Sequence, residues 1–171
     1  MNAPAKARGL AAAAPQRDEE LKVRYLECLN LIERLHRQLL DVIKDELDRV
    51  GQQDVNSVQA LLIFNIGEQE LTAGELRTRG HYLGSNVSYN LKKLVEAGYI
   101  HHARSEVDRR SVRVRLTERG RRIRDVFAGL IDRHVALVQP TGGIEAAAFE
   151  PLNVTLRRLE RFWLDQVRYR L

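Results

Sequence analysis

The sequence predicts a mainly α-helical protein with one small β-hairpin, and three patterns support this fold class. Apolar residues recur at three- and four-residue steps near both ends of the chain, as in amphipathic helices. Between them, residues 111–116 alternate strictly between apolar and polar, as in a half-buried strand. The segment Thr72–Arg124 holds 13 Lys and Arg against 5 Asp and Glu, a net charge of +8, whereas the chain carries +5. Because the remainder is net −3, this segregation suggests a positive face that meets a polyanion.

Length and composition limit the classes of protein. At 171 residues the chain fits one domain that can fold without a metal or a disulfide. The single Cys28 excludes an internal disulfide and a cysteine-cluster zinc site, and it fits a reducing, cytoplasmic setting. No apolar run approaches the roughly 20 residues that a membrane-spanning helix needs. Residues 1–18 are Ala-rich and too weakly hydrophobic for a secretion signal, so we expect a flexible tail.

One long amphipathic helix is expected from Asp18 to Val50, ending before Gly51. Its apolar positions are Leu21, Tyr25, Leu29, Ile32, Leu35, Leu39, Ile43, Leu47 and Val50. About 30 residues form a rod of roughly 45 Å, which is longer than a small domain covers alone. Part of this helix is therefore expected to pack on a second copy of the chain.

Two shorter helices should follow. Asn56 or Ser57 can cap the first, which is apolar nearly all round and ends near Gly67. Thr72 with Glu75 three residues later forms a capping-box pattern, which predicts the start of the second helix.

The next helix, capped by Ser85, separates its side chains into two faces. On a wheel of about 100° per residue, the apolar face contains Val87, Leu91, Leu94 and Val95. The opposite face contains Ser85, Asn86, Tyr89, Lys92 and Lys93. Hydroxyl, amide and ammonium groups can bond base edges and phosphates in a major groove about 12 Å wide. Glu96 would repel phosphate, so contacts should concentrate in the first two turns. The alternative is an ordinary amphipathic surface helix.

A β-hairpin should come after Gly98, which can close that helix. Tyr99–Ala103 and Ser111–Leu116 are the expected strands, and the polar loop Arg104–Arg110 joins them. Arg109 and Arg110 in this loop could reach a narrow minor groove or its phosphates. The order helix, helix, strand, basic loop, strand is that of a winged helix-turn-helix.

Thr117 can cap a further helix with an apolar stripe. Pro151 can lie in the first turn of a last helix or kink one that begins near Glu145. The stripe of the first is formed by Ile123, Phe127, Leu130, Ile131, His134 and Val138. The apolar positions of the last are Leu152, Leu156, Leu159, Trp163 and Val167. We therefore expect a winged helix-turn-helix carried on a helical dimerisation platform, with two recognition helices about 34 Å apart.

The segment from Val87 to Arg122 resembles the core of MarR-type transcriptional regulators. The resemblance rests on the recognition helix ending Leu-Val-Glu-Ala-Gly-Tyr-Ile, on Asp108-Arg109-Arg110, and on Leu116-Thr117-Glu118-Arg119-Gly120. It implies a homodimer on a double-stranded, pseudo-palindromic DNA operator, usually a repressor released by a small-molecule effector. Within the family the chain looks most like the LdtR-type cell-envelope regulators. Residues 19–171 would form one MarR-like domain, with dimerisation helices at 19–50 and 117–171 and the winged helix at 55–116.

The resemblance also assigns residue roles. Bases would be read by Ser85, Asn86, Ser88, Tyr89, Asn90, Lys92 and Lys93. The wing would contribute Arg104, Asp108, Arg109 and Arg110, with Asp108 orienting Arg110. In the family's architecture an effector pocket lies next to the dimer helices, which makes Leu39, Leu61 and Phe64 candidate lining residues. Ordinary core packing is the favoured alternative for these three.

Other chemistries find little support in the sequence. Cys28 could sense peroxide, but no activating cation lies near it, and a buried, inert thiol is the favoured interpretation. The histidines lack zinc-site spacing, and no phosphate loop or nucleophile elbow is present. We therefore expect no enzyme, no metal and no cofactor. The alternative function is a winged-helix module whose basic face binds RNA or an acidic protein.

Overall fold

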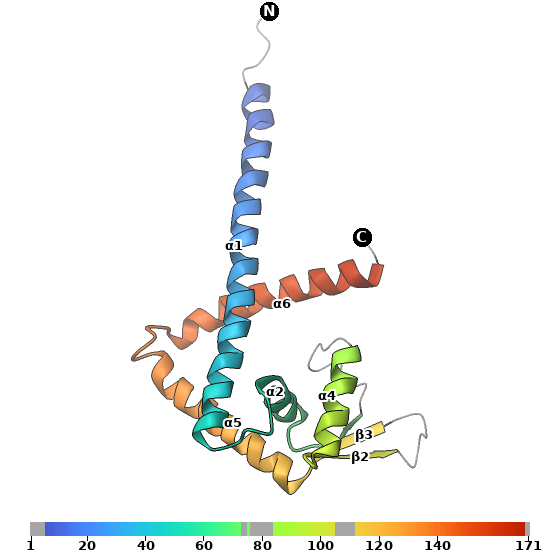
Figure 1. Cartoon of the computed structure of the whole chain (residues 1–171). Coiled ribbons are helices and arrows are strands. Elements are labelled where there is room, and N and C mark those ends of the chain that lie inside the picture. The colour runs from blue at the N-terminus through green and yellow to red at the C-terminus, as the bar shows by residue number, and fades with distance from the viewer. Residues whose placement is uncertain (1–5, 73–74, 76–83, 105–111, 170–171) are drawn as a thin grey trace, which may run out of the picture. The chain divides into compact units, whose positions relative to one another are not determined.

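The computed structural model describes residues 6–72, 75, 84–104 and 112–169 of the chain (Figure 1). It comprises two compact units, Met1–Leu62 and Ile63–Leu171. The elements in order are α1 (Lys6–Arg49), α2 (Ser57–Ile66), β1 (Leu71–Thr72), α4 (Gly84–Glu96), β2 (Ile100–Arg104), β3 (Val112–Leu116), α5 (Glu118–Val138) and α6 (Ala146–Tyr169). The predicted fold class, mainly helical with a small antiparallel sheet, is confirmed. None of the described helices combines the length and hydrophobicity needed to cross a bilayer.

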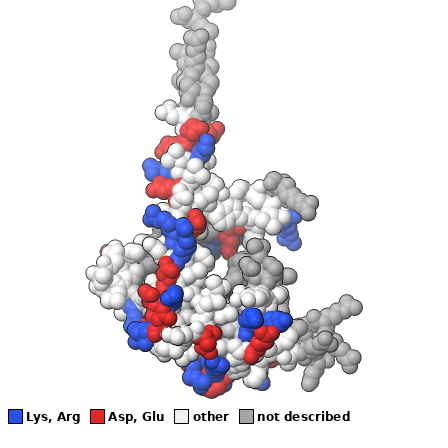
Figure 2. Space-filling view, viewed as in Figure 1, with Lys and Arg blue, Asp and Glu red and all other residues white. Residues whose placement is uncertain are grey.

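Helix α1 begins at Lys6, well before the expected start at Asp18. The helix start expected at Asp18 is therefore wrong, whereas the flexibility expected of residues 1–18 stays a prediction. Residues 1–5 lie outside the described part. Alanine has the highest intrinsic helix propensity, so the run from Ala11 to Ala14 favours continuing the helix. Figure 2 shows acidic and basic side chains side by side along α1, where ion pairs such as Lys44–Asp48 at 2.8 Å join successive turns.

The apolar stripe of α1 is buried only near its C-terminal end. Ile43 and Leu47 are almost fully buried, whereas Leu21, Leu26 and Leu35 are exposed in the single chain. Burying a side chain of this size contributes about 1.5–3 kcal/mol, so the exposed stretch is poorly stabilised by the chain alone.

A reciprocal pair of hydrogen bonds decides how α2 begins. The backbone N–H of Gln59 donates to Asn56 Oδ1 at 2.9 Å, and the backbone N–H of Asn56 donates to Gln59 Oε1 at 3.1 Å. Asn56 is therefore the N-cap and Gln59 completes the capping box. Of the two candidate caps in the sequence, the structure selects Asn56 over Ser57.

The sheet has the strand order β1-β3-β2, and both pairings are antiparallel. The hairpin β2–β3 was expected, but β1 was not, since two residues carry no readable alternation. Leu71 in β1 pairs with Val114, and both side chains are buried. Thr72 and Glu75 form the expected capping-box bonds, at 2.7 and 3.0 Å. The helix predicted after them falls outside the described residues apart from Glu75.

Helices α5 and α6 differ in how many of their apolar side chains are buried. Thr117 is the N-cap of α5, as predicted, and its hydroxyl accepts from the backbone N–H of Gly120. Ile123, Phe127 and Leu130 are buried, whereas His134, further along the predicted stripe, is exposed in the single chain. Helix α6 begins at Ala146, which places Pro151 inside the helix rather than in its first turn, and no described residue of α6 is buried.

Candidate nucleic-acid interface

Helix α4 separates its side chains into two faces, as the sequence predicted. Leu91 and Leu94 are buried, whereas Lys92 and Lys93 are exposed and Tyr89 is 62% exposed. We call the surface formed by Tyr89, Lys92 and Lys93 the reading face. It carries a phenol and two ammonium groups, which can bond base edges and phosphates.

The other residues predicted on α4 are only partly visible. The helix begins at Gly84, one position before the expected cap at Ser85. The side chains of Ser85 and Asn86 lie outside the described part. Ser88 is exposed, whereas Asn90 is half-buried and therefore less accessible to a base edge than its neighbours.

The lysines of the reading face are held by one carboxylate. Glu96 lies 3.8 Å from Lys92 Nζ and 3.4 Å from Lys93 Nζ, and Lys93 Nζ lies 6.0 Å from the Tyr89 ring centroid. Glu96 was expected only to repel phosphate, but in the free chain it also pairs with both lysines. Exposed ion pairs contribute about 0–1 kcal/mol, so an approaching phosphate can take over either lysine at little cost.

The two long strands place the expected wing. Arg104 pairs with Val112 at one end of the β2–β3 ladder, and residues 105–111 connect the two strands at that end. Asp108, Arg109 and Arg110 belong to this segment, which lies outside the described residues, as does the side chain of Arg104. Their predicted roles at the DNA therefore stay predictions.

Strand β3 alternates as its sequence indicated. Val114 and Leu116 are buried, whereas Arg113 and Arg115 are exposed on the other face. A guanidinium nitrogen of Arg113 lies 3.6 Å from a carboxylate oxygen of Glu70. Part of the positive charge counted in the sequence is thus neutralised within the protein.

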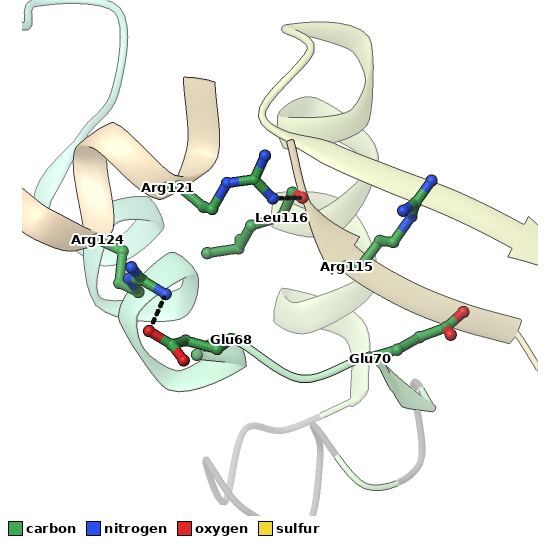
Figure 3. A pocket seen from close by; sticks show the side chains of 7 residues that line it. Glu68, Glu70, Arg115, Leu116, Arg121 and Arg124 are labelled. Atoms are coloured by element: carbon green, nitrogen blue, oxygen red, sulfur yellow. Dashed lines mark hydrogen bonds and ion pairs between the residues drawn. The ribbon is translucent and has the colours of Figure 1, made fainter. Parts of the chain in front are cut away.

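A cleft of about 460 Å³ lies between the residues that follow α2, the end of β3 and the start of α5 (Figure 3). Its lining residues are Gly67, Glu68, Glu70, Arg115, Leu116, Arg121 and Arg124. Arg124 bonds Asp125 at 2.7 Å and Glu68 at 3.1 Å, and Arg121 bonds Glu118 at 2.8 Å. The hydrogen bonds that Arg124 donates to the Asp125 carboxylate are the main cause that raises the pKa of Arg124.

Arg121 and Arg124 in this cleft are bonded to the protein's own carboxylates, so they stabilise the fold rather than bind an anion. All three guanidinium nitrogens of Arg124 bond Asp125 or Glu68, and those of Arg121 bond Glu118 or the Leu116 carbonyl. An anionic ligand would have to displace these carboxylates to reach Arg121 or Arg124. The network instead ties Glu68 to α5.

The residues expected to line an effector pocket do not line this cleft. Phe64 is half-buried and its ring packs on Phe127, with centroids 4.3 Å apart. Leu39 is 36% exposed, and Leu61 is half-buried. Their role in binding an effector stays a prediction. Cys28 is half-buried, and among the described residues no three His, Cys, Asp or Glu side chains gather as metal ligands.

Comparison with known proteins agrees with this geometry. A family model described as a winged helix DNA-binding domain matches residues 55–120. The exopolysaccharide II synthesis transcriptional activator ExpG of Rhizobium meliloti is 37% identical over 165 residues, which cover 95% of this chain and 84% of ExpG.

Solved structures share the fold. FabT of Streptococcus pneumoniae, crystallised in complex with DNA, matches 82% of this chain and 98% of its own with a TM-score of 0.63 at 22% identity. A mutant MarR from E. coli complexed with operator DNA matches 76% and 91% with a TM-score of 0.60 at 19% identity. These structures show that the chain has the fold expected from the wing and the Leu-Thr-Glu-Arg-Gly motif, the fold of MarR. The chain belongs to the family of the transcriptional activator ExpG and carries a winged helix DNA-binding domain.

Proposed function

We propose that two copies of this chain bind one pseudo-palindromic DNA operator, each with its α4 reading face in a major groove and its wing at the adjacent minor groove. The observation that carries the proposal is the exposure of Tyr89, Lys92 and Lys93 on a helix whose other face is buried. In helix-turn-helix proteins the N-terminal half of such a helix contacts the bases. Arg109 and Arg110 would bind in the minor groove or to its phosphates.

The dimer is inferred from apolar side chains that a single chain leaves uncovered. Large exposed apolar residues occur on α1, on the C-terminal half of α5 and along α6. Large apolar side chains exposed along a helix are typical of a surface that packs on another protein chain. A twofold axis would place two α4 helices about one duplex turn, or roughly 34 Å, apart.

Whether the protein represses or activates a gene depends on where its operator lies relative to the promoter. A protein that covers a promoter excludes the polymerase, whereas one bound upstream can contact it. The family resemblance favours a ligand-responsive repressor, while the relative ExpG is named an activator. A reporter gene placed behind the bound promoter, with and without this protein, distinguishes the two. Likeness to the LdtR-type subgroup remains an expectation, and DNA binding implies that the protein works in the cytoplasm.

The proposed DNA contacts are tested by removing one positive charge from the reading face and one from the wing. Lys92→Ala and Arg109→Ala should each weaken binding to a duplex that the wild-type protein enriches from a random pool, because each removes a phosphate or base contact. Binding is measured by fluorescence anisotropy at several salt concentrations. Lys22→Ala on α1 removes the same charge elsewhere and should leave affinity unchanged. If both substitutions leave affinity unchanged while the dimer persists, the assignment is wrong.

The alternative, a module that binds RNA or an acidic protein, is tested with the same protein. A DNA reader should bind its selected duplex far more tightly than folded RNA or heparin of similar charge. Equal affinity for all three polyanions would favour the alternative.

A further inference from the structure

The C-terminal end of α4 is bound by the first turn of α5. Helix ends leave backbone carbonyls without a partner inside the helix. Here Arg119 Nη1 donates to the Ala97 carbonyl at 2.8 Å, and Thr117 Oγ1 lies 2.7 Å from the Gly98 carbonyl oxygen, to which it donates. The backbone N–H of Thr117 donates to the Tyr99 carbonyl at 3.0 Å. Three successive carbonyls at the end of α4 are therefore bonded by two residues about 20 positions further along the chain.

Arg119 makes a second contact with the same segment. Its guanidinium carbon lies 4.3 Å from the ring centroid of Tyr99, within the range of a cation–π interaction. The Tyr99 side chain has no exposed surface, whereas Arg119 is largely exposed. The guanidinium group of Arg119 thus lies against the buried Tyr99 ring and also bonds the Ala97 carbonyl at the end of α4.

Gly120 sets the spacing between the two elements. It is buried, and a Cβ added to it would collide with the Tyr99 carbonyl oxygen. Gly98, with a φ of 75°, turns the chain out of α4 so that Tyr99 can approach. We call Thr117, Arg119 and Gly120 the clamp.

The clamp holds the C-terminal end of α4, whereas the base contacts are expected in its first two turns. A helix of 13 residues is roughly 20 Å long, so a tilt of about 10° at one end moves the other by roughly 3 Å. A displacement of that size exceeds the tolerance of a hydrogen bond to a base edge. Phosphate contacts by flexible lysines tolerate it better, because they carry no sequence information.

We propose that Arg119 is a positioning residue for sequence recognition: it fixes the orientation of α4 on α5 and does not itself bind DNA. The inference rests on the proposed function, in which α4 reads the operator. It predicts that loss of the clamp lowers discrimination between sequences more than it lowers general affinity for DNA.

The test compares Arg119→Gln with Arg122→Gln, a matched control. Arg122 is exposed in the same turn of α5, and none of the described residues forms a hydrogen bond or an ion pair with its side chain. Each protein is titrated, over a range of salt, with the duplex that the wild type enriches from a random pool and with a scrambled duplex. In Arg119→Gln the ratio of the affinity for the selected duplex to that for the scrambled duplex should fall about tenfold or more. The slope of log affinity against log salt concentration should stay at the wild-type value. Arg122→Gln should keep the ratio, and Arg119→Lys should restore part of it by keeping the cation.

Direct DNA contact gives a different result. If Arg119 binds a phosphate, Arg119→Gln weakens both duplexes equally and lowers the salt slope by about 1, which would overturn the proposal. An unchanged ratio would also overturn it. Thr117→Val, which is isosteric, and Thr117→Ser provide a second test, because Val removes the hydroxyl that bonds the Gly98 carbonyl and Ser keeps it. The Val variant should lose discrimination and the Ser variant should keep it. If the wild type does not discriminate between the duplexes, the proposed function itself fails.

Discussion

Gly120 shows how a single position without a side chain can determine packing. The backbone of α5 approaches the Tyr99 carbonyl so closely at Gly120 that no Cβ fits. A Cβ built there would also lie 3.3 Å from the Leu116 side chain. A glycine in a helix usually costs about 0.5–1 kcal/mol relative to alanine. At Gly120 the close approach reverses this preference.

Gly120→Ala should therefore lower the free energy of unfolding by about 1–3 kcal/mol, since backbone has to move to admit the methyl group. Gly129→Ala is the matched control in the same helix, because its Cβ would meet only the end of the Arg133 side chain at 3.7 Å. The control should be neutral or should gain up to about 1 kcal/mol from helix propensity. Urea unfolding followed by circular dichroism measures both. A Gly120→Ala protein as stable as wild type would show that the two backbones are not in contact.

Glu118, in the first turn of α5, should make stability depend on pH. The hydrogen bond from Arg121 lowers the pKa of Glu118 below its usual 4.5. A carboxylate with a lower pKa in the folded chain stabilises it above pH 4.5, and this contribution is lost as the pH falls through the folded value. Wild type should unfold at a higher temperature than Glu118→Gln at pH 7, and the difference should close toward pH 3. Glu145→Gln, which removes a carboxylate with no ion pair in the described structure, should show no such trend.

Helix caps illustrate what local sequence predicts about the elements and what it leaves open. Thr117 and the Thr72–Glu75 pair were identified correctly, because a cap depends on residues three positions apart. For α2 the sequence offered Asn56 and Ser57, and only the hydrogen bonds to Gln59 distinguish them.

Asn56→Ala should accordingly destabilise the protein by about 1 kcal/mol, because the backbone N–H of Gln59 loses its acceptor. Ser57→Ala, one residue later, should change stability by only a few tenths of that. Thermal unfolding of the two variants under the same conditions compares them. Equal losses, or a larger loss for Ser57→Ala, would contradict the assignment of the cap.

Contacts distant in sequence explain most of what could not be predicted. Strand β1 exists because Leu71 pairs with Val114, 43 positions later, and two residues give no periodic signal. Arg119 was visible only as part of a motif, since its partner Ala97 lies 22 positions away. The N-terminal start of α1 was missed for a different reason: the Ala-rich segment lacks an amphipathic pattern, although its helix propensity is high.

At the scale of the whole molecule, the described chain leaves many large apolar side chains in water. On α6 these include Leu152, Phe162, Trp163, Leu164 and Val167, and no described residue of this helix is buried. The sequence predicted a helix with Leu152, Trp163 and Val167 among its apolar positions, but it did not single out Phe162 or Leu164. It could not show which of them face another chain, since that depends on the tertiary fold.

Val167→Asp should shift the protein from dimer toward monomer. Val167 is 79% exposed in the single chain, so a carboxylate there costs a monomer little but would be buried in the proposed dimer. Asn153→Asp, an exposed position on the same helix, introduces the same charge and should leave the dimer intact. Sedimentation velocity distinguishes the two masses. Wild-type protein that sediments as a single chain at micromolar concentration would contradict the dimer.

Methylation interference on the selected duplex tests the central claim most directly, because N7-methylguanine blocks the major groove without changing the phosphates. The account predicts two patches of interference, centred about one helical turn apart and related by the twofold axis of the operator. Replacing Lys92 by Ala should weaken both patches together. A single patch, or binding that ignores major-groove methylation, would contradict the claim that paired α4 helices read the DNA.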